Sequence, residues 1–355
     1  MVKHMRVSVV GATGFIGRRL VESLCDEGVK VAAVSRHVSE ESFRGCASGN
    51  IVPIVADLTD AASLEGVCAD ADVIFHLAGH AHASDVNEKS ATLIHRQLTV
   101  EGTRSLLAQA CRAGVKRFVF VSSVKAMGEG SEVCIDESTA ATPVTEYGRA
   151  KLLAEQLVTA AGRNCGMHVS ILRLPMVYGP GVKGNLMQMI AAIDCGRFPR
   201  LPEVDNRRSM VHIDDVVQAL RLAVDNPKAN GEVYIVTDGL VYSTYEIYML
   251  IRRALGRADP KWTISTEILR ALARVGDAVG RVCARPVPFH SIALRKLLGS
   301  AWYSSTKIER DLQFKPTQTF ETALPTIVEE YRTSRWQNGR PTTVRRLLSQ
   351  RRSSP

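Results

Sequence analysis

The feature that most restricts the fold is a glycine-rich turn between a short apolar run and a helical pattern at the start of the chain. The apolar run is Arg6–Val10, the turn is Gly11–Gly17, and the helical pattern covers Ile16–Glu27. A helix that begins in such a turn offers free N–H groups and a positive dipole end to phosphate. The sequence therefore predicts a dinucleotide-binding unit at the N-terminus.

Each glycine of the turn has a separate role. Gly11 permits the tight turn, Gly14 lets the backbone approach a pyrophosphate, and Gly17 lets the helix lie close to the sheet. The residues of the turn that we expect to bind the cofactor are Gly11, Thr13, Gly14, Phe15, Ile16 and Gly17.

Strand-like and helical segments alternate through the first half of the chain. Further strands are predicted at 29–34, 51–55, 72–77, 117–122 and 169–172, and long helices at 94–113 and 145–161. Strands separated by helices indicate an α/β fold with a Rossmann-like, doubly wound parallel sheet. Hydrophobic residues make up 45% and charged residues 23% of the chain, which excludes wholesale disorder.

The domain organisation follows from a loosening of this pattern near Pro175. Beyond it, short apolar pieces alternate with proline and glycine, which predicts a smaller mixed α/β lobe for the substrate. We expect a Rossmann domain over 1–174, a substrate lobe over 175–332 with some segments returning to the first domain, and a basic tail over 333–355. In such folds, ligands bind at the carboxyl ends of the strands.

The residues after the second, third and fourth strands bear on the choice of cofactor. An acidic residue after the second strand would favour NAD, whereas this chain has Ser35 and Arg36 there. Arg36 can pair with a 2′-phosphate, so we expect NAD(P) with a preference for NADP; an Arg36 that stacks on adenine or is only solvated is the alternative. Asp57 can accept a hydrogen bond from the adenine amino group. The further cofactor contacts expected here are Ser35, Arg36, Asp57, Leu58, Leu77, Ala78 and Gly79.

Ser123, Tyr147 and Lys151 form the predicted chemical site. Ser123 follows a strand at the ligand-binding edge, while Tyr147 and Lys151 are four residues apart and share a helix face. A free tyrosine has a pKa of about 10, and an adjacent lysine cation, with the positive nicotinamide of an oxidised cofactor, favours the phenolate. The phenolate can take a proton from a carbinol hydroxyl while hydride leaves carbon, with Ser123 holding the oxygen.

Together these residues resemble the extended short-chain dehydrogenase/reductase family. Gly11–Gly17, Ser123 and Tyr147–Lys151 are similar to its cofactor loop and catalytic residues, and Leu172–Gly181 is similar to the segment that closes over the nicotinamide. From residue 5 to about 330, the chain resembles the branch that contains nucleotide-sugar epimerases, dehydratases and 4-keto reductases.

The resemblance implies further contacts and partners. Pro175 would contact the cofactor, and Asn185 and Arg208 would contact the diphosphate of a UDP-sugar substrate. An arginine suits a diphosphate because it can donate two parallel hydrogen bonds. The resemblance also implies a homodimer formed through the helices at 94–113 and 145–161. We expect no nucleic-acid partner, because relatives of this fold that bind nucleic acid tend to lose the tyrosine or the lysine, and this chain has both.

Two departures from the family pattern bear on the chemistry. Thr99 stands where relatives usually carry Asn, so the hydration around the catalytic lysine is expected to differ. The dehydratases place an Asp-Glu pair shortly after the serine, whereas Val124–Met127 follows Ser123 here. Elimination of water needs an acid and a base, and this segment lacks the Asp-Glu pair, so a dehydratase is not expected.

Two reactions at sugar C4 remain. A 4-keto reductase delivers hydride once, whereas a 4-epimerase oxidises C4, turns the keto sugar over and returns the hydride to the other face. Ser35 and Arg36 favour the reductase. The runs Val121–Lys125, Tyr178–Asn185 and Asp205–Ser209 are similar to bacterial proteins of surface-polysaccharide synthesis, and this resemblance implies reduction of a UDP-4-keto-6-deoxy-N-acetylhexosamine. A UDP-glucose or UDP-N-acetylglucosamine 4-epimerase is the alternative. A non-catalytic NAD(P)-binding regulator is more distant, because such proteins tend to lose the tyrosine or the lysine.

Basic residues gather in two places outside this site. The formal net charge is +9, and Thr333–Pro355 holds six arginines and no acid, which is typical of a solvated chain end. The segment Ile268–Val282 has Leu269, Leu272, Val275 and Val279 at helical spacing, with arginines at 270, 274 and 281. This basic amphipathic pattern predicts either weak contact with a membrane surface or packing inside the substrate lobe.

The remaining features predict a cytoplasmic protein without a metal. Eight cysteines occur without a CxxC pair, and the N-terminus lacks the pattern of an export signal, so we expect reduced thiols. No apolar run approaches the roughly 18 residues of a membrane span. His80 and His82 have no third ligand at useful spacing, so no metal site is expected.

Overall fold

The computed structural model describes residues 5–43, 46, 49–79, 92–283 and 289–337. The chain divides into two compact units, each built from three separate segments. Unit 1 comprises Met1–Val177, Arg207–Val241 and Ser300–Gln318. Unit 2 comprises Tyr178–Asn206, Tyr242–Gly299 and Thr319–Pro355.

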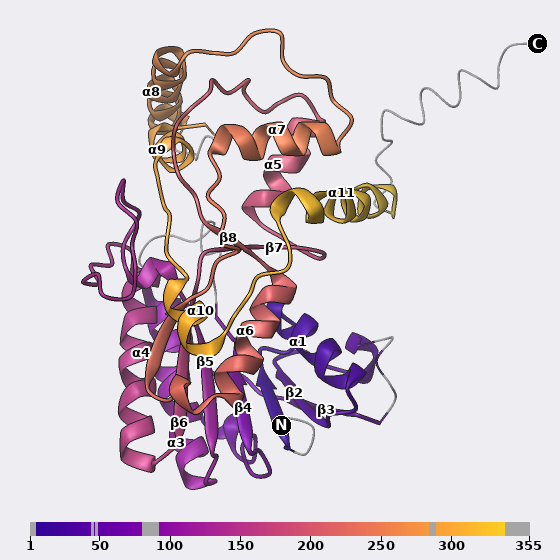
Figure 1. The fold of residues 1–355 in the computed structure, drawn as a ribbon, viewed down its shortest axis with the longest axis vertical. Coiled ribbons are helices and arrows are strands. Elements are labelled where there is room, and N and C mark those ends of the chain that lie inside the picture. The colour runs from indigo at the N-terminus through magenta and orange to yellow at the C-terminus, as the bar shows by residue number, and fades with distance from the viewer. Residues whose placement is uncertain (1–4, 44–45, 47–48, 80–91, 284–288, 338–355) are drawn as a thin grey trace, which may run out of the picture. The chain divides into compact units, whose positions relative to one another are not determined.

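Unit 1 is built on a seven-stranded sheet with the order β3-β2-β1-β4-β5-β6-β9 (Figure 1). Its strands are β1 (Val7–Val10), β2 (Val31–Ser35), β3 (Ile51–Val55), β4 (Val73–His76), β5 (Arg117–Ser123), β6 (His168–Leu174) and β9 (Glu232–Ile235). Every pairing in the sheet is parallel. The strand order changes direction between β1 and β4, as in doubly wound sheets, so the predicted Rossmann-like fold is confirmed.

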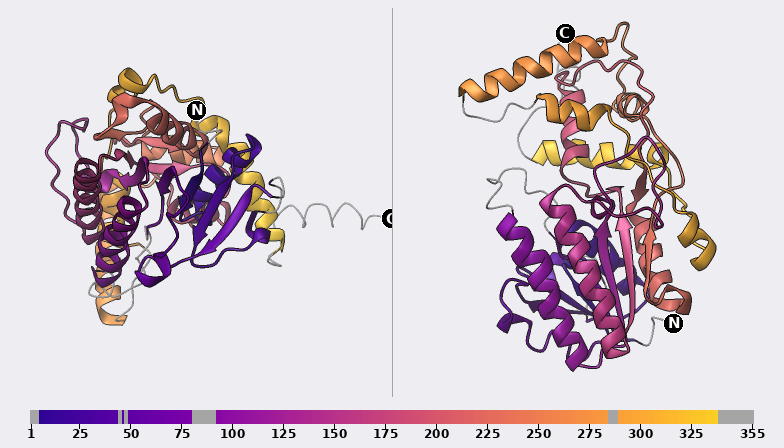
Figure 2. Two further views of the ribbon diagram at one scale, coloured as in Figure 1. Left: turned by 90° about the horizontal axis from the view of Figure 1, so that it is seen from below. Right: turned by 90° about the vertical axis from the view of Figure 1, so that its left-hand side faces the viewer.

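Two hydrophobic clusters cover the two faces of the sheet. The helices of unit 1 are α1 (Phe15–Asp26), α3 (Gly102–Arg112), α4 (Glu146–Cys165), α6 (Ile213–Asp225) and α10 (Thr306–Leu312). One cluster joins Leu24 of α1 and Leu220 of α6 to inward-facing strand residues such as Phe75. The other joins α3 and α4 to the opposite face, where Phe118 and Phe120 are fully buried. The right-hand view of Figure 2 shows α3 and α4 side by side along this face.

The helix that carries the predicted chemical site has strong signals at both ends. The Thr145 side chain accepts a hydrogen bond from the Gly148 N–H at 3.2 Å and so caps the N-terminus of α4. Gly166 follows the last helical residue with a φ of 64°, the left-handed conformation that ends many helices. These signals fix which residues of α4 face the sheet.

The start of α6 is capped by a histidine, although Asp214, a residue type that often caps helices, lies two positions further on. The His212 side chain supplies the cap, because its Nδ1 accepts a hydrogen bond from the Asp214 N–H at 3.2 Å. The Asp214 carboxylate instead accepts a hydrogen bond from Arg19 of α1 at 2.5 Å. A tertiary ion pair therefore replaces the local cap.

The predicted helix at 94–113 contains a change of helix type. A π-helical segment, His95–Glu101, leads directly into α3. The wider turn of a π-helix changes the face on which side chains emerge, and such segments are common at functional sites. Here it places both His95 and Thr99 in the interior.

Unit 2 consists mainly of helices joined by irregular segments. Its helices are α5 (Asn185–Asp194), α7 (Thr244–Ala254), α8 (Thr266–Cys283), α9 (Ser291–Leu298) and α11 (Phe320–Gln337). Helix α7 packs against α5 and α11, and α8 packs against α9. The short ladder of β7 (Met176–Tyr178) and β8 (Met210–His212) belongs to unit 1, apart from Tyr178. In the described ranges, no helix combines the length and the apolar character that crossing a bilayer requires.

A disulfide joins Cys111 of α3 to Cys165 at the end of α4, with 5.7 Å between the two Cα atoms. The prediction that all cysteines are reduced is therefore wrong for this pair. The sequence gives no sign of it because the two cysteines are 54 residues apart and meet only through the packing of α3 on α4. Among the other cysteines whose side chains the structure describes, five have free thiols: Cys25, Cys46, Cys68, Cys134 and Cys195.

We expect the Cys111–Cys165 bond to stabilise unit 1. Closing a loop of this length in the unfolded chain corresponds to about 4 kcal/mol by the chain-entropy relation. Replacing both cysteines by serine should lower the free energy of unfolding by roughly 2–4 kcal/mol in urea titrations. A Cys195→Ser variant, which changes an exposed free thiol, is the control and should leave the midpoint unchanged. Equal midpoints for all three proteins would contradict the expectation.

Candidate functional site

The glycine-rich turn lies against the loop that follows β4. Gly11 has a φ of 91°, and a Cβ atom there would lie 2.7 Å from the Ala78 backbone nitrogen. A Cβ at Gly17 would collide with the Gly11 carbonyl oxygen. Only glycine fits at both positions, because one needs a left-handed backbone and the other a close approach of helix to turn. The backbone of Leu77 and Ala78 therefore lies directly against the turn.

The N-terminus of α1 leaves donor groups available for a phosphate. Gly14 is the N-cap residue, no side chain caps the helix, and the first turn holds no acidic residue. The N–H groups of Phe15 and Ile16 therefore remain at the positive end of the helix dipole. Thr13 and Ser35 share a hydrogen bond of 2.7 Å between their hydroxyls, which ties the turn to the end of β2.

The expected adenosine contacts have distinct surroundings. Arg36 is exposed directly after β2. The Asp57 carboxylate accepts hydrogen bonds from the backbone N–H and the hydroxyl of Thr59, at 2.9 and 2.8 Å, and these bonds, with the nearby Arg36 charge, lower its pKa. Leu58 has its side chain buried in the core beside Gly102, so only its backbone is open to a ligand. Asp57 therefore holds the conformation of its own loop through Thr59 and also interacts with the charge of Arg36.

Ser123, Tyr147 and Lys151 are brought together at the carboxyl end of β5. Ser123 is the last residue of β5, and Tyr147 and Lys151 lie in the first turns of α4. A Cβ at Gly148 would collide with the Lys125 carbonyl oxygen, so this glycine lets α4 lie against the segment after β5. The Ser123 and Tyr147 side chains are joined by a hydrogen bond.

Two features of the protein act on the Tyr147 phenol in the absence of a bound cofactor. Burial raises the pKa of the Tyr147 phenol, and the Ser123 hydrogen bond opposes this rise. The Lys151 ammonium donates a hydrogen bond to the Val121 carbonyl at 2.9 Å. In the protein alone, Tyr147 is therefore a protonated phenol, which is the form that donates a proton to a carbonyl oxygen.

The surroundings of Lys151 are unusually apolar for an ammonium group. Its Nζ lies 4.6 Å from the centre of the Phe120 ring, and a Cβ at Gly79 would come within 3.2 Å of it. Burial lowers the pKa of Lys151 to about 8, and the charge of Glu155 partly offsets this fall. The nearby His76 is neutral, because burial lowers its pKa to about 3, and it shares a hydrogen bond of 2.8 Å with Thr103.

Two residues of the π-helical segment complete the interior around Tyr147. The His95 ring lies 5.4 Å from the Tyr147 ring, centre to centre. The Thr99 hydroxyl is buried and meets no hydrogen-bond partner in the described part of the chain. Thr99 thus occupies the position where the family usually carries Asn, but its shorter side chain makes no hydrogen bond to a neighbouring described residue.

A buried ionic network beneath Lys151 was missed by sequence reasoning. Glu155 lies one turn after Lys151 on α4, and its carboxylate accepts two hydrogen bonds from Arg173 of β6, at 3.1 and 2.6 Å. It also accepts a short hydrogen bond from the Ser122 hydroxyl. The only sequence signal is a carboxylate on the helix face that otherwise carries small apolar residues, Ala154 and Val158.

The remaining expected site residues lie in several places. Pro175 joins β6 to β7, Asn185 is the exposed first residue of α5 in unit 2, and Arg208 lies in unit 1. Burial lowers the pKa of Arg208. His80 and His82 lie outside the described residues. Among the residues that are described, no group of three metal-ligating side chains occurs.

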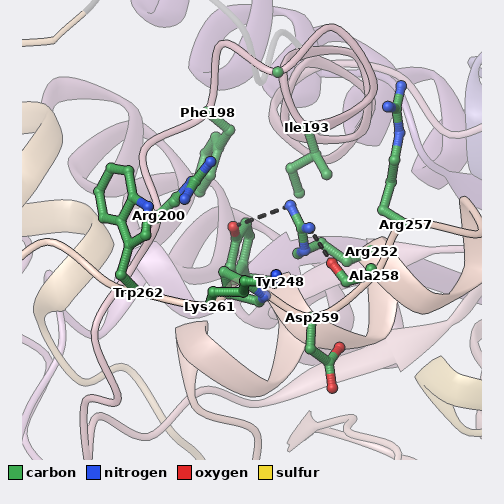
Figure 3. Close-up of a pocket in the computed structure, with 12 residues that line it drawn as sticks. Ile193, Phe198, Arg200, Tyr248, Arg252, Arg257, Ala258, Asp259, Lys261 and Trp262 are labelled. Atoms are coloured by element: carbon green, nitrogen blue, oxygen red, sulfur yellow. Dashed lines mark hydrogen bonds between the residues drawn. The ribbon is translucent and has the colours of Figure 1, made fainter.

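Unit 2 contains a basic and aromatic cavity of about 560 Å³ that none of the expected site residues lines (Figure 3). The Arg200 guanidinium lies 3.9 Å from the centre of the Trp262 ring, and Arg252 donates to the Tyr248 hydroxyl at 3.3 Å. Ile193 of the cavity wall lies near the end of α5, about 12 Å along the helix from Asn185 at 1.5 Å per residue. The cavity is therefore separate from the predicted diphosphate contact on α5.

The parallel sheet, the glycine turn and the open helix N-terminus define a dinucleotide-binding protein of the Rossmann class. Residues 7–237 match the NAD dependent epimerase/dehydratase family, and the chain belongs to that family. The family description names NAD as the cofactor.

Three known proteins illustrate the similarity. A UDP-glucose 4-epimerase from Vibrio cholerae is 30% identical over 320 residues, which cover 89% of this chain and 92% of that protein. The N-acetyl-alpha-D-glucosaminyl-diphospho-ditrans,octacis-undecaprenol 4-epimerase of Escherichia coli O157:H7 is 24% identical and covers 85% of this chain and 88% of its own length. The structure of MoeE5 in complex with UDP-glucose and NAD has a TM-score of 0.72 at 24% identity, covering 93% of this chain and 99% of that one.

We expect Glu155→Gln to weaken both the fold and the lysine charge. The change leaves the buried Arg173 cation without its carboxylate partner, and breaking such a pair lowers stability by about 3–5 kcal/mol. It also removes the charge that raises the Lys151 pKa, so the alkaline limb of the pH–rate profile should move to lower pH. Urea unfolding and a pH series of initial rates measure the two effects.

Glu146→Gln is the matched control for this substitution. Glu146 is on the same helix and pairs with Arg149 at the surface, where an ion pair is worth about 0–1 kcal/mol. A Glu155→Gln protein as stable as the Glu146→Gln protein would contradict the importance of the buried network.

We expect Lys151→Met to remove turnover and to increase stability at neutral pH. The pKa of Lys151 is about 8 in the folded protein and about 10.4 in the unfolded chain. Below pH 8 the charged lysine therefore lowers the free energy of unfolding by up to roughly 3 kcal/mol. Between pH 8 and 10.5 the folded lysine releases its proton while the unfolded lysine retains it. The stability advantage of the variant should therefore shrink over that range, as thermal melts at several pH values can measure. An advantage that is constant with pH would refute this account.

Proposed function

We propose that the protein is a UDP-sugar 4-epimerase that retains NAD as its cofactor. The observation that carries the proposal is the grouping of Ser123, Tyr147 and Lys151 at one sheet edge in the unit that holds the glycine-rich turn. The two relatives named as 4-epimerases support epimerisation at C4. This reverses the preference for a reductase that Ser35 and Arg36 suggested.

The side chains of the site divide the proton transfer between them. In the first half-reaction the Tyr147 phenolate takes the proton of the C4 hydroxyl as hydride leaves C4, and in the second half-reaction the resulting phenol returns the proton to the C4 keto oxygen. Ser123 stabilises this phenolate, because its hydrogen bond lowers the Tyr147 pKa. The Lys151 ammonium adds positive charge to the same interior. NAD held at the N-terminus of α1 would accept the hydride from C4 and return it to the other face of the keto sugar.

Two expected contacts would hold the rest of the substrate and cofactor. Asn185 and Arg208 are the proposed diphosphate contacts, and the N-terminus of α1 is the proposed pyrophosphate site of the cofactor. Tyr147 then reaches the sugar while Pro175 contacts the nicotinamide side of the dinucleotide. The helices α3 and α4 are the proposed homodimer surface, on which Leu153 is about half exposed.

A 4-keto reductase that uses NADPH is the second candidate. Its support is the exposed Arg36 directly after β2, where a 2′-phosphate would find a bidentate partner. A dehydratase is disfavoured because the segment after Ser123 supplies Lys125, which forms an ion pair of 2.9 Å with Glu129, in place of an acid and base for elimination.

We expect denatured protein to release close to one NAD per chain, because an epimerase must keep the cofactor between its two half-reactions. Incubation with UDP-glucose should yield UDP-galactose, as chromatography of the nucleotide sugars can detect. A protein that contains no NAD and oxidises NADPH with a 4-keto sugar nucleotide would instead be the reductase.

We expect Tyr147→Phe to lower kcat by about 10²–10⁴-fold, because the ring remains while the proton carrier is lost. The NAD content should be unchanged, since the hydroxyl is not part of the glycine turn. Tyr245→Phe, on α7 of unit 2, is the control and should retain full activity. Undiminished biological activity of the Tyr147→Phe protein would favour a dinucleotide-binding regulator over an enzyme.

A further inference from the structure

Helix α8 presents an exposed aliphatic stripe. Ile268, Leu272, Val275 and Val279 recur at intervals of four, three and four residues, so they share one side of the helix. Their exposed fractions are 54%, 48%, 60% and 44%. A contiguous apolar surface of this kind on a folded protein marks a contact with something else. We call these four residues the α8 stripe.

The α8 stripe is distinct from the side of α8 that packs within unit 2. Leu269 and Ala273 are fully buried, and a Cβ at Gly276 would collide with the Phe289 carbonyl oxygen just before α9. The sequence grouped Leu269 with Leu272, Val275 and Val279 in one apolar face. The structure instead assigns Leu269 to the packed side and Ile268 to the open side. Packing within the lobe therefore accounts for only one of the two apolar sides of α8.

The polar residues of α8 are basic on balance. Arg270, Arg274 and Arg281 are all exposed, and the helical repeat places them on the side away from the stripe. Glu267 and Asp277 are the acidic residues of the helix; Asp277 accepts hydrogen bonds from Ser291 of α9. An aliphatic side opposite an arginine-rich side is the arrangement of helices that lie in the plane of a membrane surface.

We propose that the α8 stripe docks the protein on an anionic phospholipid surface. The aliphatic side chains enter the boundary between headgroups and acyl chains, and the long arginine side chains extend back to anionic headgroups. The net charge of +9 favours approach to such a surface. The proposal does not depend on whether the enzyme is an epimerase or a reductase.

A second copy of the chain fits the α8 stripe less well. The spacing matches the seam of a coiled coil, but α8 has 18 residues and so supplies only about two heptads. The positions beside the seam hold Ala271 and Ala278, which give no ion pairs to fix a register. Four half-exposed aliphatic residues also offer far less than the roughly 800 Å² that each partner contributes to a standard interface. A lipid surface needs neither register nor a large area.

The test is flotation of the full-length protein with vesicles made of equal parts phosphatidylcholine and phosphatidylglycerol. The wild-type protein should float with these vesicles, and binding should weaken when phosphatidylglycerol is omitted or salt is raised. A Leu272→Asp/Val275→Asp double variant should lose at least tenfold in the bound-to-free ratio. Its turnover of a water-soluble sugar nucleotide should equal that of the wild type.

Val55→Asp/Val133→Asp is the matched control, because both valines are exposed in unit 1, at 66% and 72%. It should float like the wild type. If the aspartate double variant of α8 does not fold, Leu272→Ser/Val275→Ser replaces it with the same expected loss. The proposal is overturned if the wild type does not float with the vesicles, or if the α8 variant floats as well as the control. It is also overturned if the wild type sediments as an oligomer and the α8 variant as a monomer while both bind vesicles equally.

Discussion

The ammonium group of Lys151, held in a dry interior, is the constraint on which the site depends. It lies between the Val121 carbonyl and the face of Phe120, and burial brings its pKa down to about 8. A charge in such a place is expensive unless other groups compensate for it. The surrounding structure supplies that compensation through a carboxylate on the same helix, and it keeps the neighbouring His76 neutral so that no second cation competes.

That compensation couples catalysis to the core of the sheet. Glu155 sits between Lys151 and Arg173, so one carboxylate serves the lysine and also neutralises a buried guanidinium on β6. The arrangement stabilises the charges in place but adds little net stability compared with apolar packing. Its purpose is positional, because it orients α4 so that Tyr147 lies over the carboxyl end of β5 beside Ser123. Stability and the proposed proton transfer therefore depend on the same few side chains.

The structure also separates surfaces that the sequence could not distinguish. Helix α8 reads as one amphipathic pattern, yet one apolar side is used for packing against α9 and the other remains open. Similarly, the resemblance to nucleotide-sugar enzymes says nothing of the arginine-lined cavity in unit 2, whose walls come from α5, α7 and the loop after α7. Both features depend on which residues meet after the helices pack, and that is a property of the tertiary arrangement.

The sequence by itself determined the parallel sheet, the glycine-rich turn and the grouping of Ser123, Tyr147 and Lys151. Those features depend on local spacing: a glycine is required where backbones approach within contact distance, and residues four apart share a helix face. Tertiary structure alone decided the Cys111–Cys165 bond, the Glu155–Arg173 pair, the His212 cap and the rise of the Tyr147 pKa on burial. Each of these features joins residues that are distant in the chain or depends on burial. The spacing of neighbouring residues in the sequence predicts neither long-range contacts nor the exclusion of water.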